Sequence, residues 1–111
     1  MININGENWR ILLVSPEHPQ LWIDPERKYA LGVCDDIQKK IYINDTLSNH
    51  LLKKVLAHEL THAAMFSYNV PLGHEEEELV ADLIATYGQE IIEHTNIIFL
   101  RIKEKREDIL K

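Results

Sequence analysis

The spacing of apolar residues along the chain changes from strand-like to helix-like near residue 45. Before this point, short runs rich in β-branched and aromatic residues predict three strands, at residues 9–14, 29–34 and 40–43. Asp35 and Asp36 separate the second run from the third and predict a hairpin. We therefore expect a small antiparallel sheet in this part of the chain.

After this point, apolar residues at helical spacing predict a helix that begins after Ser48 or Thr46 and ends near Tyr68. Its apolar stripe consists of Leu51, Leu52, Val55, Leu56, Leu60, Ala63 and Phe66. A segment that contains both a proline and a glycine, residues 69–73, ends this helix. A second helix is expected from His74 onward, since its acidic first turn suits the positive end of the helix dipole.

The C-terminal segment carries a further apolar stripe. Ile91, Thr95, Ile98 and Ile102 fall at spacings of four, three and four residues, which is typical of one face of a helix. We expect this face to dock the C-terminal helix on the core. A seam between two copies of the chain is the alternative.

Length and composition indicate one folded domain. With 111 residues, 45% of them hydrophobic, the chain can bury about 65% of its unfolded surface. We expect a single α+β domain, with a sheet portion at residues 1–45 and a helical portion at residues 46–111. The formal net charge of -6 argues against a nucleic-acid surface, which normally carries a basic patch.

Cysteine usage and the N-terminus bear on the compartment. A single cysteine forms no internal disulfide, which fits a reducing cytoplasm. Residues 1–5 lack the basic region and apolar core of a secretion signal. The longest apolar run, residues 97–100, is far too short to span a bilayer. We therefore expect a cytoplasmic protein with no membrane partner.

The most informative pattern is an H-E-x-x-H array at residues 58–62, inside the first predicted helix. Residues four apart lie on one face of a helix, so His58 and His62 can present two imidazoles to one metal ion. Glu59 lies beside them, placed to act on water at the metal. This pattern is typical of zinc-dependent hydrolases. Met65 stands where a longer form of the pattern needs glycine, so the third ligand comes from elsewhere.

Glu78 is the candidate for that third ligand. It lies four residues before Asp82, so the two carboxylates share one face of the second helix, with small residues beside them. Glu78 would complete a His, His, Glu zinc site, and Asp82 would hold one of the two imidazole rings through its second nitrogen. For the acidic residues at 75–77, the helix dipole is a sufficient explanation.

Two segments resemble the small zinc metallopeptidases of the ImmA and IrrE type, which are common in phages and mobile elements, and more distantly the gluzincins of the thermolysin-like group. They are residues 56–63, Leu-Ala-His-Glu-Leu-Thr-His-Ala, and residues 78–85, Glu-Leu-Val-Ala-Asp-Leu-Ile-Ala. The second is similar to that family's Glu-x-x-Ala-Asn-x-Phe-Ala segment. The resemblance covers the middle third of the chain and implies three zinc ligands and a general base, namely His58, His62, Glu78 and Glu59.

The chain departs from the family pattern at two positions. Thr61 replaces a frequent glycine, and Asp82 stands where the family often has asparagine. Neither departure removes a ligand. A second group of relatives, the SprT-like proteins, usually takes its third ligand from a histidine, for which His74 is the nearby candidate; we rank it below Glu78.

The resemblance also implies a minimal zincin-like fold, in which a small sheet precedes the helix with the array and the helix with the glutamate ligand. In that family an edge strand borders the cleft, and an extended peptide adds to it by main-chain hydrogen bonds. We expect residues 40–43 to form this edge.

These features predict a zinc-dependent metallopeptidase that hydrolyses peptide bonds of a protein or peptide substrate, with Zn²⁺ as cofactor and Glu59 as general base. The first alternative is an inactive metal-binding module of the same fold, with a regulatory or interaction role. The second is a helical interaction protein whose array is accidental. No residue identifies the substrate, the oligomeric state or an activating partner.

Overall fold

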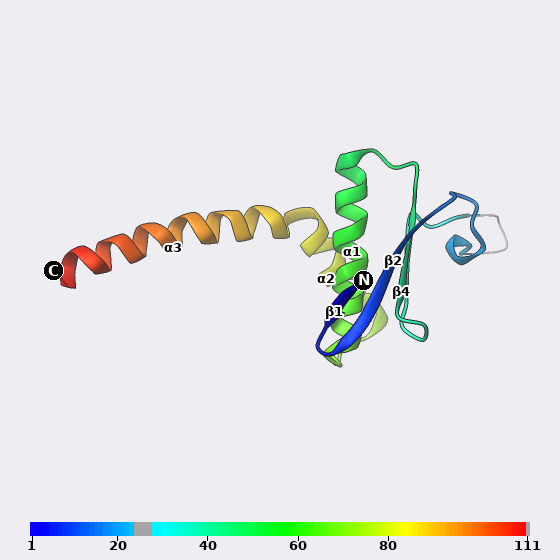
Figure 1. The fold of residues 1–111 in the computed structure, drawn as a ribbon, viewed down its shortest axis with the longest axis horizontal. Helices are drawn as coiled ribbons and strands as arrows, with labels where there is room; N and C mark the ends of the chain where they lie inside the picture. The colour runs from blue at the N-terminus through cyan, green and yellow to red at the C-terminus, as the bar shows by residue number, and fades with distance from the viewer. Residues whose placement is uncertain (24–27, 111) are drawn as a thin grey trace.

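The computed structural model describes residues 1–23 and 28–110, and places a sheet before a series of helices (Figure 1). The strands are β1 (Ile2–Ile4), β2 (Glu7–Val14), β3 (Gly32–Asp35) and β4 (Lys40–Asn44). The helical elements are the 3-10 turn η1 (Pro19–Leu21), α1 (Asn49–Ser67), α2 (His74–Leu83), the π-helical turn η2 (Ile84–Gly88) and α3 (Gln89–Leu110). This arrangement confirms the α+β class.

The four strands form a mixed sheet in the order β1-β2-β4-β3. β1 pairs antiparallel with β2 through a turn at Asn5 and Gly6, which have φ angles of 49° and 84°. β3 and β4 form the predicted hairpin around residues 36–39. β4, however, runs parallel to β2, with Leu12 opposite Tyr42. The prediction of a wholly antiparallel sheet is therefore wrong.

Burial explains why β4 lies inside the sheet. Ile41 and Ile43 are fully buried, and only 6% of Tyr42 is exposed. An internal strand has both backbone edges paired and can have both faces covered, which suits the most apolar strand of the set. The prediction that residues 40–43 form the edge is wrong, because β3 takes that position.

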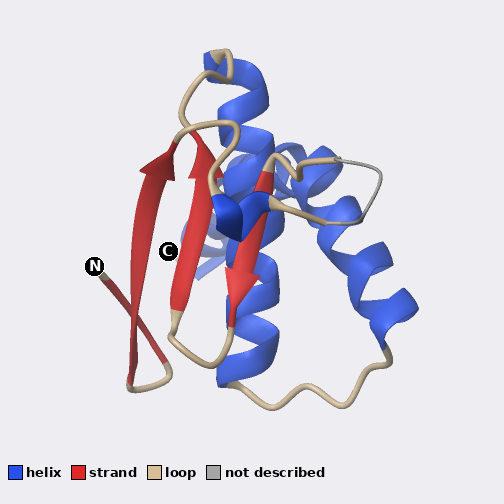
Figure 2. Ribbon diagram, turned by 90° about the vertical axis from the view of Figure 1, so that its right-hand side faces the viewer, coloured by secondary structure: helices blue, strands red, loops and turns tan. Residues whose placement is uncertain are grey.

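One face of the sheet packs against α1, which lies behind the strands in Figure 2. Trp9, Ile41 and Ile43 meet Ala63 of α1 in a core of fully buried residues. The indole N–H of Trp9 also donates a hydrogen bond to Ser67 Oγ at 2.8 Å. This buried bond fastens β2 to the last turn of α1 and satisfies a polar group that water cannot reach.

The opposite face is covered by the segment around η1. Leu21 in this turn is fully buried, and the ring of His18 stacks on Tyr42 with a centroid separation of 5.6 Å. Successive side chains of a strand point to opposite faces, so Tyr42 faces η1 while its two neighbours face α1. The central strand is therefore covered on both sides.

Both ends of α1 lie where the sequence predicts them. Ser48 is the N-cap, and its side chain accepts a backbone N–H of the first turn at 3.4 Å. Asn69, with φ at 53°, adopts the left-handed conformation that commonly ends a helix. α2 begins at His74 as predicted, and the carboxylate of Glu76 accepts the N–H of Gly73 at 2.8 Å.

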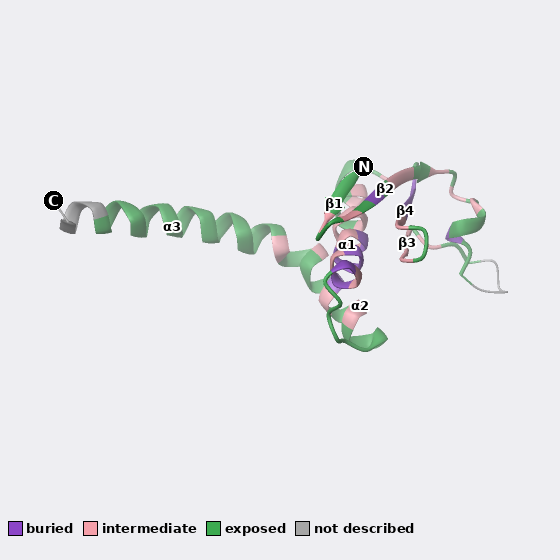
Figure 3. Cartoon of the chain, turned by 60° about the horizontal axis from the view of Figure 1, so that its bottom comes forward, coloured by how far each residue is buried: buried purple, intermediate pink, exposed green. Residues whose placement is uncertain are grey.

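α3 does not dock on the core. All side chains of residues 91–106 are exposed (Figure 3), and the helix projects from the body after η2. The radius of gyration is 17.7 Å, compared with about 13 Å for a compact domain of this length. The docking prediction is wrong because spacing encodes an apolar face but not what covers it. Neither α3 nor another helix of the described residues has the length and apolar character needed to cross a membrane.

The bond between Trp9 and Ser67 gives a test of the fold. Ser67→Ala should lower the free energy of unfolding by about 1–3 kcal/mol, because the buried indole N–H loses its acceptor. Chemical denaturation of the parent, Ser67→Ala, Trp9→Phe and the double variant measures this cost. In the Trp9→Phe background, which has no indole N–H, the cost of Ser67→Ala should largely disappear. An equal cost in both backgrounds would contradict the assignment.

Candidate metal centre

α1 and α2 bring three metal-binding side chains together. The turn at residues 68–73 reverses the chain, so that α2 packs along α1 and Glu78 faces the histidines of the array. His58, His62 and Glu78 each offer an atom within 4.8 Å of the others. This is the one such group of three or more His, Cys, Asp and Glu residues in the described part of the chain.

The atoms that face one another are the Nε2 atoms of the two imidazoles and the two oxygens of the Glu78 carboxylate. His58 Nε2 lies 3.2 Å from His62 Nε2. Glu78 Oε2 lies 3.3 Å from His58 Nε2, and Glu78 Oε1 lies 2.8 Å from His62 Nε2. The three side chains therefore converge on one point between the helices.

A carboxylate holds the other nitrogen of each ring. His58 Nδ1 lies 3.0 Å from Asp82 Oδ1, and His62 Nδ1 lies 2.6 Å from Glu77 Oε1. An ionised carboxylate only accepts hydrogen bonds, so each Nδ1 is the donor in its pair. When the imidazole is neutral, the lone pair on Nε2 is then directed at the shared point; when the imidazole is protonated, Nε2 donates to the Glu78 carboxylate.

The convergence of these nitrogens and the carboxylate requires positive charge between them. Two unprotonated nitrogens and a carboxylate repel one another at separations of about 3 Å, unless protons or a metal cation lie between them. Two imidazoles and a carboxylate are a ligand set of catalytic zinc. Ligands about 2.0–2.2 Å from a tetrahedral zinc lie about 3.3–3.6 Å from each other. The separations of 3.2 and 3.3 Å are close to this range, whereas the 2.8 Å between His62 Nε2 and Glu78 Oε1 is shorter and has the length of a hydrogen bond.

Glu59 lies beside this group under the edge strand. A Cβ on Gly32 of β3 would lie 2.8 Å from Val55 Cγ1 and 3.0 Å from Glu59 Cγ, so only glycine permits this close approach to α1. Glu59 is 7% exposed. Burial raises the pKa of its carboxyl above the ordinary value, while His58 and His62 act to lower it. The carboxylate is therefore a stronger base than an exposed glutamate.

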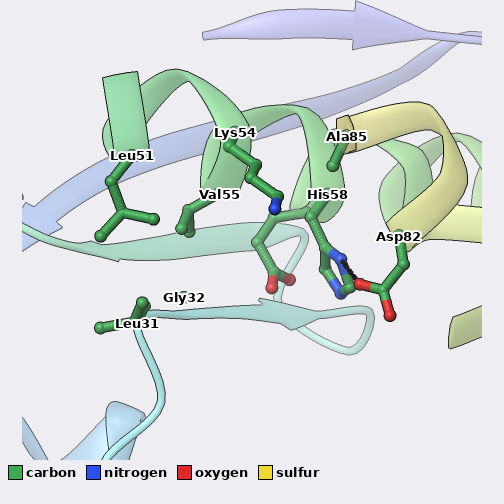
Figure 4. Close-up of a pocket in the computed structure, with 9 residues that line it drawn as sticks. Leu31, Gly32, Leu51, Lys54, Val55, His58, Asp82 and Ala85 are labelled. Carbon is green, nitrogen blue, oxygen red and sulfur yellow. Dashed lines mark ion pairs between the residues drawn. The ribbon is translucent and has the colours of Figure 1, made fainter. Parts of the chain in front are cut away.

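Two pockets share Gly32 and Glu59 in their walls. The first has a volume of about 280 Å³. Figure 4 shows it between Leu31 and Gly32 on the strand side and Leu51 and Val55 on α1. The ion pair between His58 and Asp82 lies at its far end (Figure 4). The pocket is mainly apolar and opens directly beside the predicted base.

The second pocket has a volume of about 340 Å³ and lies toward the start of α2. Its walls include Val33, Cys34, Phe66 and His74. Burial raises the pKa of the Cys34 thiol, with smaller contributions from nearby carboxylates that include Glu59, so the thiol stays protonated at neutral pH. His74 is exposed and is not part of the group that could hold a metal.

The structure brings together the residues that the sequence singled out. His58, His62 and Glu78 meet at one point, and Asp82 contacts the ring of His58. Sequence reasoning missed Glu77, whose side chain is only 14% exposed where it contacts His62. A signal existed, since Glu77 adjoins the ligand candidate, but its place in the first turn of α2 offered a simpler explanation.

Thr61 occupies the position where the resembled family often has glycine. It is buried, and its hydroxyl donates a hydrogen bond to the carbonyl oxygen of Ala57 at 2.8 Å. This contact lies within α1, so the departure leaves the converging side chains in place.

No family model, curated protein or solved structure matches this chain.

The contact between Glu77 and His62 predicts that Glu77 supports metal binding without being a ligand. Glu77→Ala should weaken zinc binding about 10- to 100-fold, as is typical when the carboxylate behind a ligating histidine is removed. Competition with a chromophoric chelator measures this affinity. Glu75→Ala is the matched control, because Glu75 lies in the same helical turn and is exposed. Equal affinities for the two variants would contradict the role given to Glu77.

Proposed function

We propose that this protein is a zinc-dependent metallopeptidase. The observation that carries the proposal is the convergence of His58 Nε2, His62 Nε2 and the Glu78 carboxylate, with a carboxylate behind each imidazole. Carboxylates that hold the second nitrogen of ligating histidines are a general feature of zinc sites, because they fix the tautomer and the ring orientation.

The composition of the site favours catalysis over a purely structural role. Structural zinc sites usually have four protein ligands, whereas catalytic sites have three and keep one position for water or substrate. Three side chains converge here. Glu59 supplies the further group that hydrolysis needs, a buried carboxylate next to the ligands and in the walls of two open pockets.

The proposed reaction divides roles among the residues of the site. Zinc held by His58, His62 and Glu78 would polarise the substrate carbonyl and lower the pKa of a water molecule toward about 7. Glu59 takes a proton from the attacking water as its oxygen bonds to the carbonyl carbon. Glu59 then gives the proton to the departing amine as the C–N bond breaks. The carboxylates behind the imidazoles keep both rings oriented.

The surroundings of the site suit an extended polypeptide. β3 is an edge strand, so among the described residues one side of its backbone has no strand partner in the sheet. An extended substrate can pair with this side by main-chain hydrogen bonds, which bind peptides without regard to sequence. The two pockets that flank Glu59 would then receive substrate side chains on either side of the cleaved bond.

The array, the glutamate ligand on the following helix and the sheet before them support a finer assignment to the ImmA and IrrE type, with a minimal zincin-like fold. A protein or peptide of the cytoplasm is the proposed substrate. The single cysteine is consistent with that compartment.

A comparison of Glu59→Gln with the parent tests the proposed reaction. The parent, loaded with one equivalent of zinc, should cleave members of an internally quenched peptide library or fluorescein-labelled casein. Glu59→Gln should retain zinc and lose about 10² to 10⁴ in rate, because only the base is removed. Treatment with 1,10-phenanthroline should abolish cleavage, and added zinc should restore it.

Two results would argue against this function. A zinc-loaded parent that cleaves neither the library nor casein would favour an inactive metal-binding module. Loss of zinc from Glu59→Gln in proportion to its activity would contradict the separation of ligand and base.

A further inference from the structure

α3 carries an apolar stripe that the metal site does not explain. We call it the α3 stripe, and its members are Ile91, Ile92, Thr95, Ile98, Phe99 and Ile102. At 100° per residue these positions cover about one third of the helix circumference, as expected for the buried face of an amphipathic helix. Four of these positions, residues 91, 95, 98 and 102, have spacings of four, three and four residues. This spacing is typical of the seam between two packed helices.

The large apolar residues of the α3 stripe are uncovered in the structure. Their exposed fractions range from 46% for Ile102 to 59% for Ile92 and Phe99. A shallow surface groove runs along the stripe and is lined by Ile91, Ile98, Phe99 and their neighbours. The helix projects from the body in Figure 1, so no other described element shields this face. An exposed apolar face of this extent marks an interaction surface.

The distribution of charge along the chain favours a second copy of the same chain as the partner, with its α3 in antiparallel orientation. Residues 89–111 contain five acidic and five basic side chains, so residues 1–88 carry the whole formal net charge of -6. The acidic residues at 90 and 93 give residues 89–100 a formal charge of -2, whereas residues 101–111, with five basic and three acidic side chains, carry +2. In an antiparallel pair, the basic part of each helix lies toward the acidic body of the other chain. A parallel pair sets like charges side by side.

The shape of the molecule favours the same arrangement. α3 has 22 residues and is therefore about 33 Å long. In an antiparallel pair the two bodies lie at opposite ends of the paired helices, which keeps them apart. Opposed helix dipoles add a small favourable contribution. We propose that this protein is a homodimer held together by antiparallel packing of two α3 stripes.

Association should depend on the stripe and not on exposed apolar area in general. Ile98→Glu should raise the dimer dissociation constant about 10- to 100-fold, because it places an unpaired charge in the seam. Ile97→Glu is the matched control, since Ile97 is the same residue type, is exposed to 50% against 53% for Ile98, and lies outside the stripe. Analytical ultracentrifugation of the full chain over a range of concentrations measures both constants.

The direction of packing has its own test. In a Cys34→Ala chain with Lys105→Cys, a position beside the stripe near its C-terminal end, spin labels should lie more than about 20 Å apart in the dimer, because in an antiparallel pair both labels are far from the midpoint of the stripe. Pulsed dipolar spectroscopy reports this distance. Labels at about 10 Å would show a parallel pair and overturn the proposed arrangement.

Two further outcomes would overturn the dimer. The first is a parent that remains monomeric at every concentration while it sediments with vesicles of phosphatidylcholine and phosphatidylglycerol, which would assign the α3 stripe to a lipid surface. The second is an equal loss of association in the variants at 97 and 98. Because neither variant touches the metal site, zinc binding should be unchanged in both, so this result is independent of the proposed peptidase activity.

Discussion

The main constraint on the structure is the electrostatic repulsion among three electron-rich groups that face one another between α1 and α2. This repulsion must be offset for the two helices to pack as they do. Two imidazole nitrogens and a carboxylate lie 2.8–3.3 Å apart, and such a cluster is stable only with positive charge at its centre. The carboxylates of Glu77 and Asp82 add to this need for positive charge, because they favour a proton on the Nδ1 atoms and not on the Nε2 atoms that face one another. Protons on the imidazoles or one bound metal cation would supply this charge, and a cation held by all three side chains would also fix the relative position of the two helices.

The scaffold around this cluster positions the base and the opening. The core joins the sheet to α1 through Trp9 and Ala63, so the histidines stand on a helix whose rotation is fixed. Gly32 then allows the edge strand to lie directly over Glu59. This glycine thus lies beside a buried carboxylate and in the walls of both pockets. These are features that the proposed peptide hydrolysis would use.

Local sequence predicted the features that depend on neighbours along the chain. Helix periodicity and capping gave α1 and the start of α2, and the four-residue spacings placed His58 with His62 and Glu78 with Asp82 on shared faces. Features that depend on distant contacts were not predictable. The alternation of apolar and polar residues does not show which strand of the β3–β4 hairpin pairs with β2. The parallel pairing of β4 with β2 was therefore missed. Glu77 and the free face of α3 likewise depend on tertiary packing, which spacing alone does not encode.

The most direct test of the metal centre is the zinc content of protein purified without chelators, measured by inductively coupled plasma mass spectrometry. The parent and His74→Ala should each carry about one zinc per chain, because His74 lies outside the converging group. Glu78→Ala should carry none after gel filtration, because only two ligands remain. A parent without zinc, or a Glu78→Ala variant that retains it, would contradict the three-ligand site.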